Sequence, residues 1–463
     1  MHSLAWLLFS VLVVLALGQL VWGLSKRERH WQFPTLAGAC WLFCIVPQAF
    51  GAVRNPDKFP PDALADGGLV ISLVMCILCV ATTWAGWQQG LMRRRNALPS
   101  GSAGPQMAVL KSETMLFWYG SLVFAVGFWA AWRLASLMGG FRAQFVGGAN
   151  YEIEWLGAPV KYAFFAVLIY PGFLIAFRAW LPRREGYQTV AIILMALYPL
   201  ATAVFLGRRS MTAAFVIIIA CALYFYRRFT LPPLIMTMLF ALAGVGVLVA
   251  PQYRTVASAT GDVRRAAAEV NVKAALSDVL SGEKYVEFDS LVVTSAFLNR
   301  TRQFDYGIGL YNGLVNALVP RQIVGEENKA ELLINLHQDD ARTSASVYDW
   351  EIPYGSNPTG VLDAFRAFWF LGCLMYFGLA WCMARIWSGA LKGSILQQTA
   401  YIILLLPAMG TVVGAWTTLP EQLIKAGVLL VPVHWICRDA GGKRLPLRSK
   451  RQPRYRRPKV ERA

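Results

Sequence analysis

Arginines stand at the edges of apolar stretches of this chain, where a charge is costly and therefore informative. Arg208 and Arg209 join two such stretches with almost no other polar residue between them, and Arg254 follows the next stretch. A charge beside hydrocarbon costs several kcal/mol unless it is paired or solvated. The planar guanidinium binds phosphate oxygens in a bidentate way. The arginine pair therefore predicts a phosphate or diphosphate site at a membrane surface; the alternative is a turn whose arginines reach lipid phosphates.

Other polar residues give weaker signals. Asp363 and Arg366 are three positions apart, so on a helix they share a face and can simply pair. A local ion pair is also the first explanation for Glu421 and Lys425, which are four positions apart. His337 is the only histidine of the longest polar interval. It is the only imidazole there that could serve as a base, although a lone loop histidine is more often ordinary surface.

Cysteine and histidine usage excludes several soluble enzyme classes. All eight cysteines fall in apolar stretches, so disulfides are not expected. Cys76 and Cys79 have the spacing of a redox or metal pair, but inside an apolar helix they are better explained as packing residues. The sequence has no cluster with zinc spacing, no phosphate-binding Gly-Lys-Ser/Thr loop and no Gly-x-Ser-x-Gly turn. Soluble-type ATPases, zinc hydrolases and serine hydrolases are thereby excluded, and no metal or other cofactor is expected.

The composition places the rest of the chain in a membrane. It is 56% hydrophobic and 15% charged, with a mean hydropathy of +0.46, whereas soluble domains carry about 25% charged residues. A helix needs roughly 20 apolar residues to cross about 30 Å of hydrocarbon. We expect an all-α polytopic membrane protein with eleven such helices, at 3–24, 32–53, 67–92, 114–138, 160–181, 189–206, 211–226, 231–250, 361–384, 396–415 and 420–437.

These segments divide the chain into helices 1 to 8 (1–250), a large loop (251–360), helices 9 to 11 (361–437) and a basic tail (438–463). Lys and Arg of the short loops concentrate on one side, which is the cytoplasmic one. The N-terminus and the large loop then face outward. No basic region precedes the first segment, so we expect a retained helix rather than a signal peptide. The tail explains most of the +18 net charge and suits anionic lipid; nucleic acid is a poor second choice.

Apolar spacing inside the large loop predicts helices rather than strands. Residues 262–280 are rich in alanine and charge, and 287–298 carry apolar residues at helical spacing. A further apolar stripe at 311–318 is too short to span a membrane and ends at Pro320.

Several short motifs occur in an order that resembles a known family. Arg208-Arg209 stands between helices; Phe304-Asp305-Tyr306-Gly307 and Leu318-Val319-Pro320-Arg321, with Lys329 downstream, lie in the large loop. Pro358-Thr359-Gly360 then leads into Phe370-Leu371-Gly372. This order is similar to that of the Wzy-type oligosaccharide repeat unit polymerases. The motifs cover some 160 residues, and the expected topology covers most of the chain.

The resemblance implies a GT-C-like glycosyltransferase in the bacterial inner membrane, multi-pass, with the large loop in the periplasm and the C-terminus in the cytoplasm. It implies transfer of a glycan from a polyprenyl-diphosphate carrier to another lipid-linked repeat unit, for O-antigen, capsule or exopolysaccharide, without metal. A chain-length regulator is an expected partner. On this hypothesis the diphosphate is held by Arg208, Arg209, Arg254 and Arg321, with Lys329 and Arg366 assisting, and the acceptor hydroxyl is activated by Glu287, Asp289 or His337.

Three other functions stay open. A related ligase would pass a finished glycan to a lipid core or a protein, and product length would distinguish it. A single-sugar GT-C transferase uses acidic residues of the first outer loop with a metal, but Asp57, Asp62 and Asp66 lack an adjacent pair. A transporter or flippase, which is not an enzyme, would favour internal repeats and paired broken helices, and we find neither in the sequence.

Overall fold

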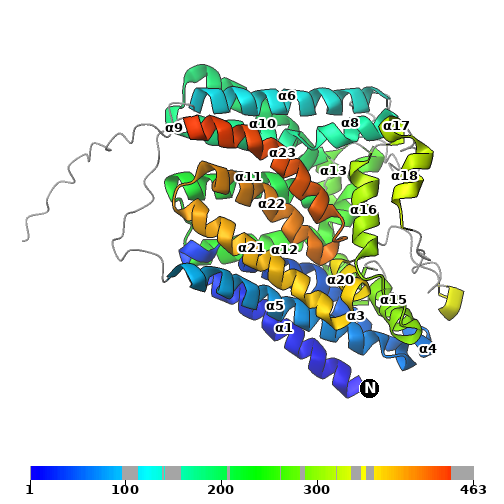
Figure 1. Cartoon of the computed structure of the whole chain (residues 1–463). Coiled ribbons are helices and arrows are strands. Elements are labelled where there is room, and N and C mark those ends of the chain that lie inside the picture. The colour runs from blue at the N-terminus through cyan, green and yellow to red at the C-terminus, as the bar shows by residue number, and fades with distance from the viewer. Residues whose placement is uncertain are drawn as a thin grey trace, which may run out of the picture.

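The computed structural model describes residues 2–95, 113–137, 140, 158–205, 209–260, 262–281, 287–319, 321–334, 346–350 and 359–439. Nearly all of these residues are helical, and the described ranges contain no β-strand. The prediction of an all-α protein is confirmed. Figure 1 shows long helices lying side by side, with shorter helices collected at one end.

Within the described ranges, nine helices are long and apolar enough to cross a membrane. The chain therefore has the build of a polytopic membrane protein. The nine are α1 (His2–Leu24), Phe33–Arg54, Gly68–Met92 of α5 (Gly68–Arg95), α6 (Glu113–Leu137), Tyr162–Pro182, α10 (Gly186–Phe205), Pro233–Ala257 of α12 (Pro233–Thr260), Gly360–Leu391 and α22 (Ile395–Val413).

Two of the eleven predicted segments are helices, but they are not among the nine that are long and apolar enough to cross a membrane. The helix α11 (Arg209–Arg227) has 19 residues, which at 1.5 Å per residue is ~28 Å, and its apolar part, Met211–Arg227, is shorter still. The helix α23 (Thr418–Asp439) has 22 residues, with Glu421 and Lys425 among them. Both run beside longer spans in Figure 1. A total of eleven therefore stays a prediction.

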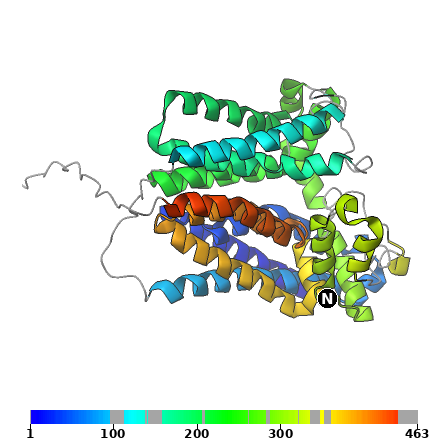
Figure 2. The ribbon, with the colours of Figure 1, turned by 45° about the horizontal axis from the view of Figure 1, so that its top comes forward.

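Small residues bring the long helices close together. A Cβ added at Gly120 of α6 would lie 2.4 Å from the backbone nitrogen of Ala176 in α9 (Ile169–Arg183). One added at Gly86 of α5 would lie 2.2 Å from the carbonyl oxygen of Phe377 in α21 (Cys373–Leu391). Such close backbone approach is how membrane helices gain dispersion contacts. Figure 2 shows the cyan and green helices α6 to α10 as a group above the blue, gold and red helices α1, α5 and α21 to α23.

Short helices of the predicted large loop gather at the end of the bundle where the N-terminus lies (Figure 1). The three helical predictions in this region are confirmed, with 262–280 divided into two helices. The helix α15 is buried along most of its length and packs on α5, on α3 and α4, and on α20, which follows the loop. The elements are α13 (Val263–Ala268), α14 (Val272–Ser281), α15 (Glu287–Thr301), α16 (Ile308–Leu318), α17 (Arg321–Val324) and α18 (Glu326–Leu332).

Two spans are irregular. Phe33–Arg54 consists of α2 (Phe33–Cys40), a π-helical turn η2 (Trp41–Ile45) and α3 (Val46–Arg54). Gly360–Leu391 consists of α20 (Gly360–Phe368), a 3-10 turn η4 (Trp369–Gly372) and α21. The remaining elements are η1 (Arg27–Arg29), η3 (Pro56–Lys58), α4 (Pro61–Ala65) and α8 (Ala158–Ala166).

The break in the Gly360–Leu391 span replaces the straight helix predicted at 361–384. Trp369 adopts φ 53° and ψ −138°, a conformation that costs a non-glycine residue free energy. The chain folds back so tightly that a Cβ on Gly372 would lie 1.8 Å from the carbonyl oxygen of Ala364. Only glycine fits there, and α20 becomes a separate short helix that is buried against α15 and α22.

Candidate functional site

Two of the motifs singled out in the sequence meet at the break in the Gly360–Leu391 span. The segment between α15 and α16 lies against α20, where the backbone N–H of Asp305 donates to the carbonyl oxygen of Arg366 at 3.0 Å. The ring of Phe304 packs edge-on against that of Phe365, with 5.9 Å between centroids. A loop segment and a membrane-span segment are thus joined in one cluster.

Arg366 is the central charge of this cluster. Its Nη2 lies 2.7 Å from Oδ1 of Asp363, and its Nε lies 3.6 Å from Oδ2 of Asp305. The second oxygen of Asp363 accepts the backbone N–H of Trp416 at 2.7 Å. The Arg366 side chain is 25% exposed, whereas that of Asp363 is 5% exposed. The two carboxylates fix the guanidinium in place, and its remaining surface is within reach of solvent.

Asp305 also organises the backbone that follows it. Its Oδ1 accepts the N–H of Gly307 at 2.9 Å, and its Oδ2 accepts the N–H of Gly309 at 3.2 Å. A Cβ on Gly309 would lie 2.5 Å from that second oxygen. One carboxylate therefore begins α16, whose N-cap is Gly307 at φ 89°, and contacts Arg366 as well.

The backbone around this junction is strained. Arg302 (φ 58°), Tyr306 (φ 50°) and Trp369 (φ 53°) all have positive φ. Each such residue costs of order 1–3 kcal/mol and persists only where its surroundings enforce it, which is common at functional sites. The guanidinium of Arg302 lies over the Trp369 ring, 5.6 Å from its centroid. This contact joins two of the strained residues directly.

Arg321 and Lys329 lie at the opposite end of α16. Lys329 donates to the carbonyl oxygen of Asn316 at 3.1 Å. Arg321, which is 43% exposed, lies 3.5 Å from Glu326. The helix between these cations and Asp305 has 11 residues, or ~16 Å at 1.5 Å per residue. The site therefore extends along α16, with a held arginine at one end and two accessible cations at the other.

Asp289, one of the three candidate bases, is buried and paired. Nζ of Lys58 lies 2.7 Å from both of its carboxylate oxygens. The Asp289 side chain is 9% exposed. Burial raises the pKa of Asp289, and the nearby Lys58 ammonium opposes that shift. This pair joins η3 to α15, two positions that are 231 residues apart.

The other two candidate bases are Glu287, which the structure describes, and His337, which it does not. Glu287 is in the first turn of α15, and its Oε2 is buried without a hydrogen-bond partner among the described residues. An unpartnered carboxylate oxygen can accept a proton, although protein atoms enclose this one. His337 lies outside the described residues.

Three of the arginines predicted to bind a diphosphate, Arg208, Arg209 and Arg254, come from the part of the chain that runs from the end of α10 to the end of α12. Arg209 begins α11 and Arg254 lies near the end of α12, while Arg208 is outside the described residues. The hydroxyl of Tyr253 donates to the carbonyl oxygen of Val204 at 2.6 Å. Tyr253 precedes Arg254, and Val204 precedes the arginine pair by four positions, so this bond links the end of α10 to the part of α12 that carries Arg254.

A third polar cluster was not foreseen. Oδ2 of Asp66 accepts the Tyr348 hydroxyl at 2.7 Å and lies 3.6 Å from Nη1 of Arg300. Burial, followed by the Asp66 carboxylate, raises the pKa of Tyr348. The sequence gives no signal for this group, since its members come from three separate parts of the chain. The predicted local pairs of Asp363 with Arg366 and of Glu421 with Lys425 are both confirmed.

Within the ranges that the structure describes, no three His, Cys, Asp or Glu side chains gather as metal ligands would. Comparison of the chain with protein-family models, with curated proteins and with solved structures finds no match. The function is therefore argued from the residues and their geometry.

Proposed function

We propose that this chain is a membrane glycosyltransferase that joins polyprenyl-diphosphate-linked oligosaccharide repeat units. The transfer takes place at the end of the bundle that carries α13 to α18, which in this proposal is the periplasmic side of a bacterial inner membrane. The observation that carries the proposal is the meeting of Asp305, from an aromatic-Gly motif of the loop, with Asp363 and Arg366 of the broken span.

In this proposal the accessible cations bind the diphosphate. Arg321 and Lys329 stand at the exposed end of α16. Arg209 begins α11 and Arg254 lies near the end of α12, and Arg208, which precedes Arg209 in the sequence, completes the proposed set. Fixed cations aimed at a leaving diphosphate stabilise the negative charge that develops on it. The reaction requires no nucleotide, since the carrier lipid itself supplies the leaving group.

Arg366 acts in this proposal as a positioning residue. Its charge is shared with Asp305 and Asp363, so it is a weaker independent anion binder than an exposed arginine. Through those carboxylates it holds the start of α16 against α20. Holding reacting groups in register supplies a large part of the rate of such transfers, and a misplacement of 1 Å can cost about 100-fold.

The chemical step is a displacement at the anomeric carbon. A hydroxyl oxygen of the acceptor glycan forms the new glycosidic bond, and the bond from the anomeric carbon to the diphosphate oxygen breaks. The diphosphate leaves with the bonding electron pair, and the hydroxyl proton passes to a base. Glu287 is the described candidate for that base because its Oε2 is buried without a partner in the described ranges; His337 and Asp289 are the alternatives from the sequence.

Reconstitution of the protein with a polyprenyl-diphosphate-linked repeat unit in nanodiscs, with EDTA present, tests this function. We expect a ladder of products on a gel. Arg321→Ala removes an accessible cation and should lower product formation by about 10²–10³-fold, as loss of a charge-stabilising donor does. Arg265→Ala is the matched control, because Arg265 also forms an exposed ion pair, with Glu269, in a short helix of the same region.

Equal ladders from both variants would exclude Arg321 from the site. A single transfer product without a ladder would indicate the related ligase. Products that disappear with EDTA and return with a divalent cation would show that the transfer depends on metal.

One observation favours a second candidate, a transporter of lipid-linked glycans. The span Gly360–Leu391 is broken by η4, and Phe33–Arg54 contains a π-helical turn. Discontinuous helices form substrate sites in many transporters. The two irregular spans are the second and the ninth predicted segments, so they do not form an obvious repeat pair. Movement of the lipid-linked substrate across the bilayer without a product ladder would support the transporter and contradict the glycosyltransferase.

A further inference from the structure

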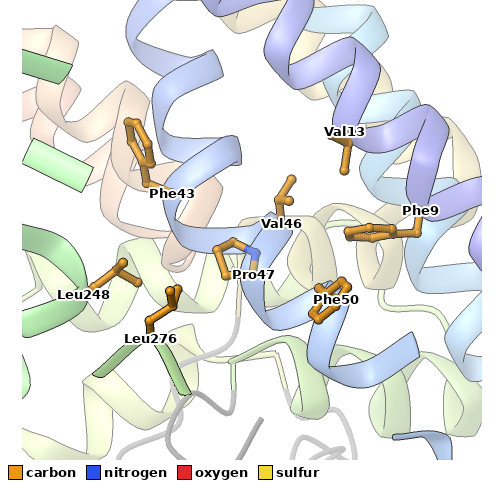
Figure 3. Close-up of a pocket in the computed structure, with 8 residues that line it drawn as sticks. All are labelled: Phe9, Val13, Phe43, Val46, Pro47, Phe50, Leu248 and Leu276. Carbon is orange, nitrogen blue, oxygen red and sulfur yellow. The ribbon is translucent and has the colours of Figure 1, made fainter. Parts of the chain in front are cut away.

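An apolar cavity of about 350 Å³ lies between three spans at the end that carries the short helices. Figure 3 shows Phe9 and Val13 of α1 on one side and Leu248 of α12 with Leu276 of α14 on the other. Side chains of the irregular second span, Val46 among them, lie between the two sides (Figure 3). Every lining residue has a hydrocarbon side chain.

Uneven packing of α12 creates this cavity. The α12 span is 17% buried, the smallest fraction among the nine spans found in the described ranges, against 61% for Phe33–Arg54. The two helices touch at Gly244, where an added Cβ would lie 2.7 Å from the Phe43 ring. One turn later in α12, Leu248 lines the cavity. The π-helical turn and Pro47 lie in the wall that faces this gap.

The chemistry of the cavity suits a hydrocarbon chain. The cavity is open to the outside of the bundle and its lining is apolar, so it offers water few hydrogen-bond partners and does not hold it stably. If a methylene group occupies about the 30 Å³ that a water molecule takes in the liquid, the cavity has room for on the order of ten methylene groups. That is part of one lipid chain, namely the part nearest the headgroup.

Two exposed cations are carried by helices that line the cavity. Arg54 follows Phe50, a lining residue, by four positions in α3, so the two share a helix face. Lys273 precedes Leu276 by three positions in α14. Both cations are exposed, and α14 packs across α3. An occupant with its chain in the cavity would present its headgroup to these two charges.

We propose that this cavity holds one acyl chain of an anionic phospholipid, with the lipid phosphate against Arg54 and Lys273. The lipid fills the gap beside α12 and fastens α12 and α14 to α1 and α3. This assignment is independent of the proposed glycosyl transfer, because it rests on the cavity and these two cations alone.

Native mass spectrometry of the delipidated full chain, titrated with phosphatidylglycerol, phosphatidylcholine or polyprenyl phosphate, tests the assignment. We expect one phosphatidylglycerol to bind more tightly than phosphatidylcholine. Val13→Phe fills the cavity and should weaken the first bound phosphatidylglycerol by at least about tenfold, or ~1.4 kcal/mol. Val14→Phe is the matched control, because Val14 is 67% exposed and does not line the cavity.

The two cations are tested separately. Arg54→Gln combined with Lys273→Gln should remove the preference for phosphatidylglycerol over phosphatidylcholine, whereas Arg264→Gln, at an equally exposed cation of α13, should not. Equal lipid binding by the Val13 and Val14 variants would overturn the assignment. So would binding of polyprenyl phosphate alone in a manner that depends on Val13, since the occupant would then be the carrier lipid.

Discussion

Two charge centres at the same end of the bundle each hold a cation against carboxylates. In one, Lys58 lies 2.7 Å from both oxygens of Asp289, in the first turn of α15. In the other, Arg366 is shared between Asp305 and Asp363, the latter in the first turn of α20. Each centre joins a loop to a buried helix.

The surroundings of the two centres differ. Positive φ occurs beside Arg366, at Tyr306 and Trp369, whereas the described residues of α15 and of Pro56–Lys58 have none. The pair of Lys58 and Asp289, one cation with one carboxylate on an unstrained backbone, is what a purely structural contact requires. Strain that the surrounding fold maintains is a sign of function. A buried ion pair alone therefore does not mark a functional site. An ion pair beside a strained backbone, such as that of Arg366, is a better candidate for a functional site.

The largest effect is expected at the unstrained centre. Lys58→Ala leaves the Asp289 carboxylate buried without its partner, which typically costs about 3–5 kcal/mol of stability. Thermal unfolding in detergent measures the loss. The double variant Lys58→Met/Asp289→Leu should regain most of it, since an apolar pair of similar volume replaces the ions. Equal melting temperatures for the single and double variants would contradict a structural role for this pair.

The strained centre should respond in activity rather than in stability. Arg366→Lys keeps a cation but loses the fork that reaches two carboxylates, and we expect product formation to fall by up to about 100-fold. Under the proposed role the turnover rate falls more than the affinity for the lipid-linked substrate. Initial rates at several substrate concentrations separate the two. A change confined to affinity would make Arg366 a substrate-binding residue.

The break in the span can be tested with two glycines. Gly372→Ala places a Cβ 1.8 Å from the carbonyl oxygen of Ala364, whereas a Cβ at Gly378 of α21 meets nothing within 4 Å. We expect Gly372→Ala to lower stability by about 1–3 kcal/mol, as overpacking does, and Gly378→Ala to be neutral or slightly stabilising. If both variants melt at the same temperature, the chain does not fold back at η4 as described.

The smallest effect is expected from His30. Its titration changes stability with pH, and this change must be distinguished from any pH effect of the two charge centres. Burial lowers the pKa of His30 from its ordinary 6.5, against an opposing contact with the Leu24 backbone. The unfolded chain therefore binds the proton more readily, and stability should fall as the pH drops below 6.5. His30→Gln should remove this dependence, while His434→Gln, at an exposed position, should keep it.

Local patterns in the sequence predicted the elements well. Nine of the eleven expected spans were found, as were the helices at 287–298 and 311–318, because apolar periodicity acts over neighbouring residues. The pair Asp363 and Arg366 followed from helical spacing alone. Local spacing carries this information because residues three or four apart in a helix are always neighbours.

Contacts between distant parts of the chain were not predictable in the same way. Asp305 was noted only as part of a motif, and its carboxylate contacts with Arg366 and the α16 backbone depend on the tertiary fold. The bond from Lys58 to Asp289 spans 231 positions. No proline marks the break at Trp369 in the sequence. The one local indication is Gly372, where only glycine fits because the carbonyl oxygen of Ala364 lies so close.

The Asp305 carboxylate has a consequence for how relatives of this chain could be recognised. It binds the N–H groups of Gly307 and Gly309, and a side chain at position 309 would collide with it. Descendants of a common ancestor should therefore keep the pattern Asp-x-Gly-x-Gly in the loop together with Asp-x-x-Arg at the start of the broken span. A loss of Asp305 in one lineage should be accompanied by a change at Arg366. Such paired substitution would be visible even between chains whose overall sequences no longer align.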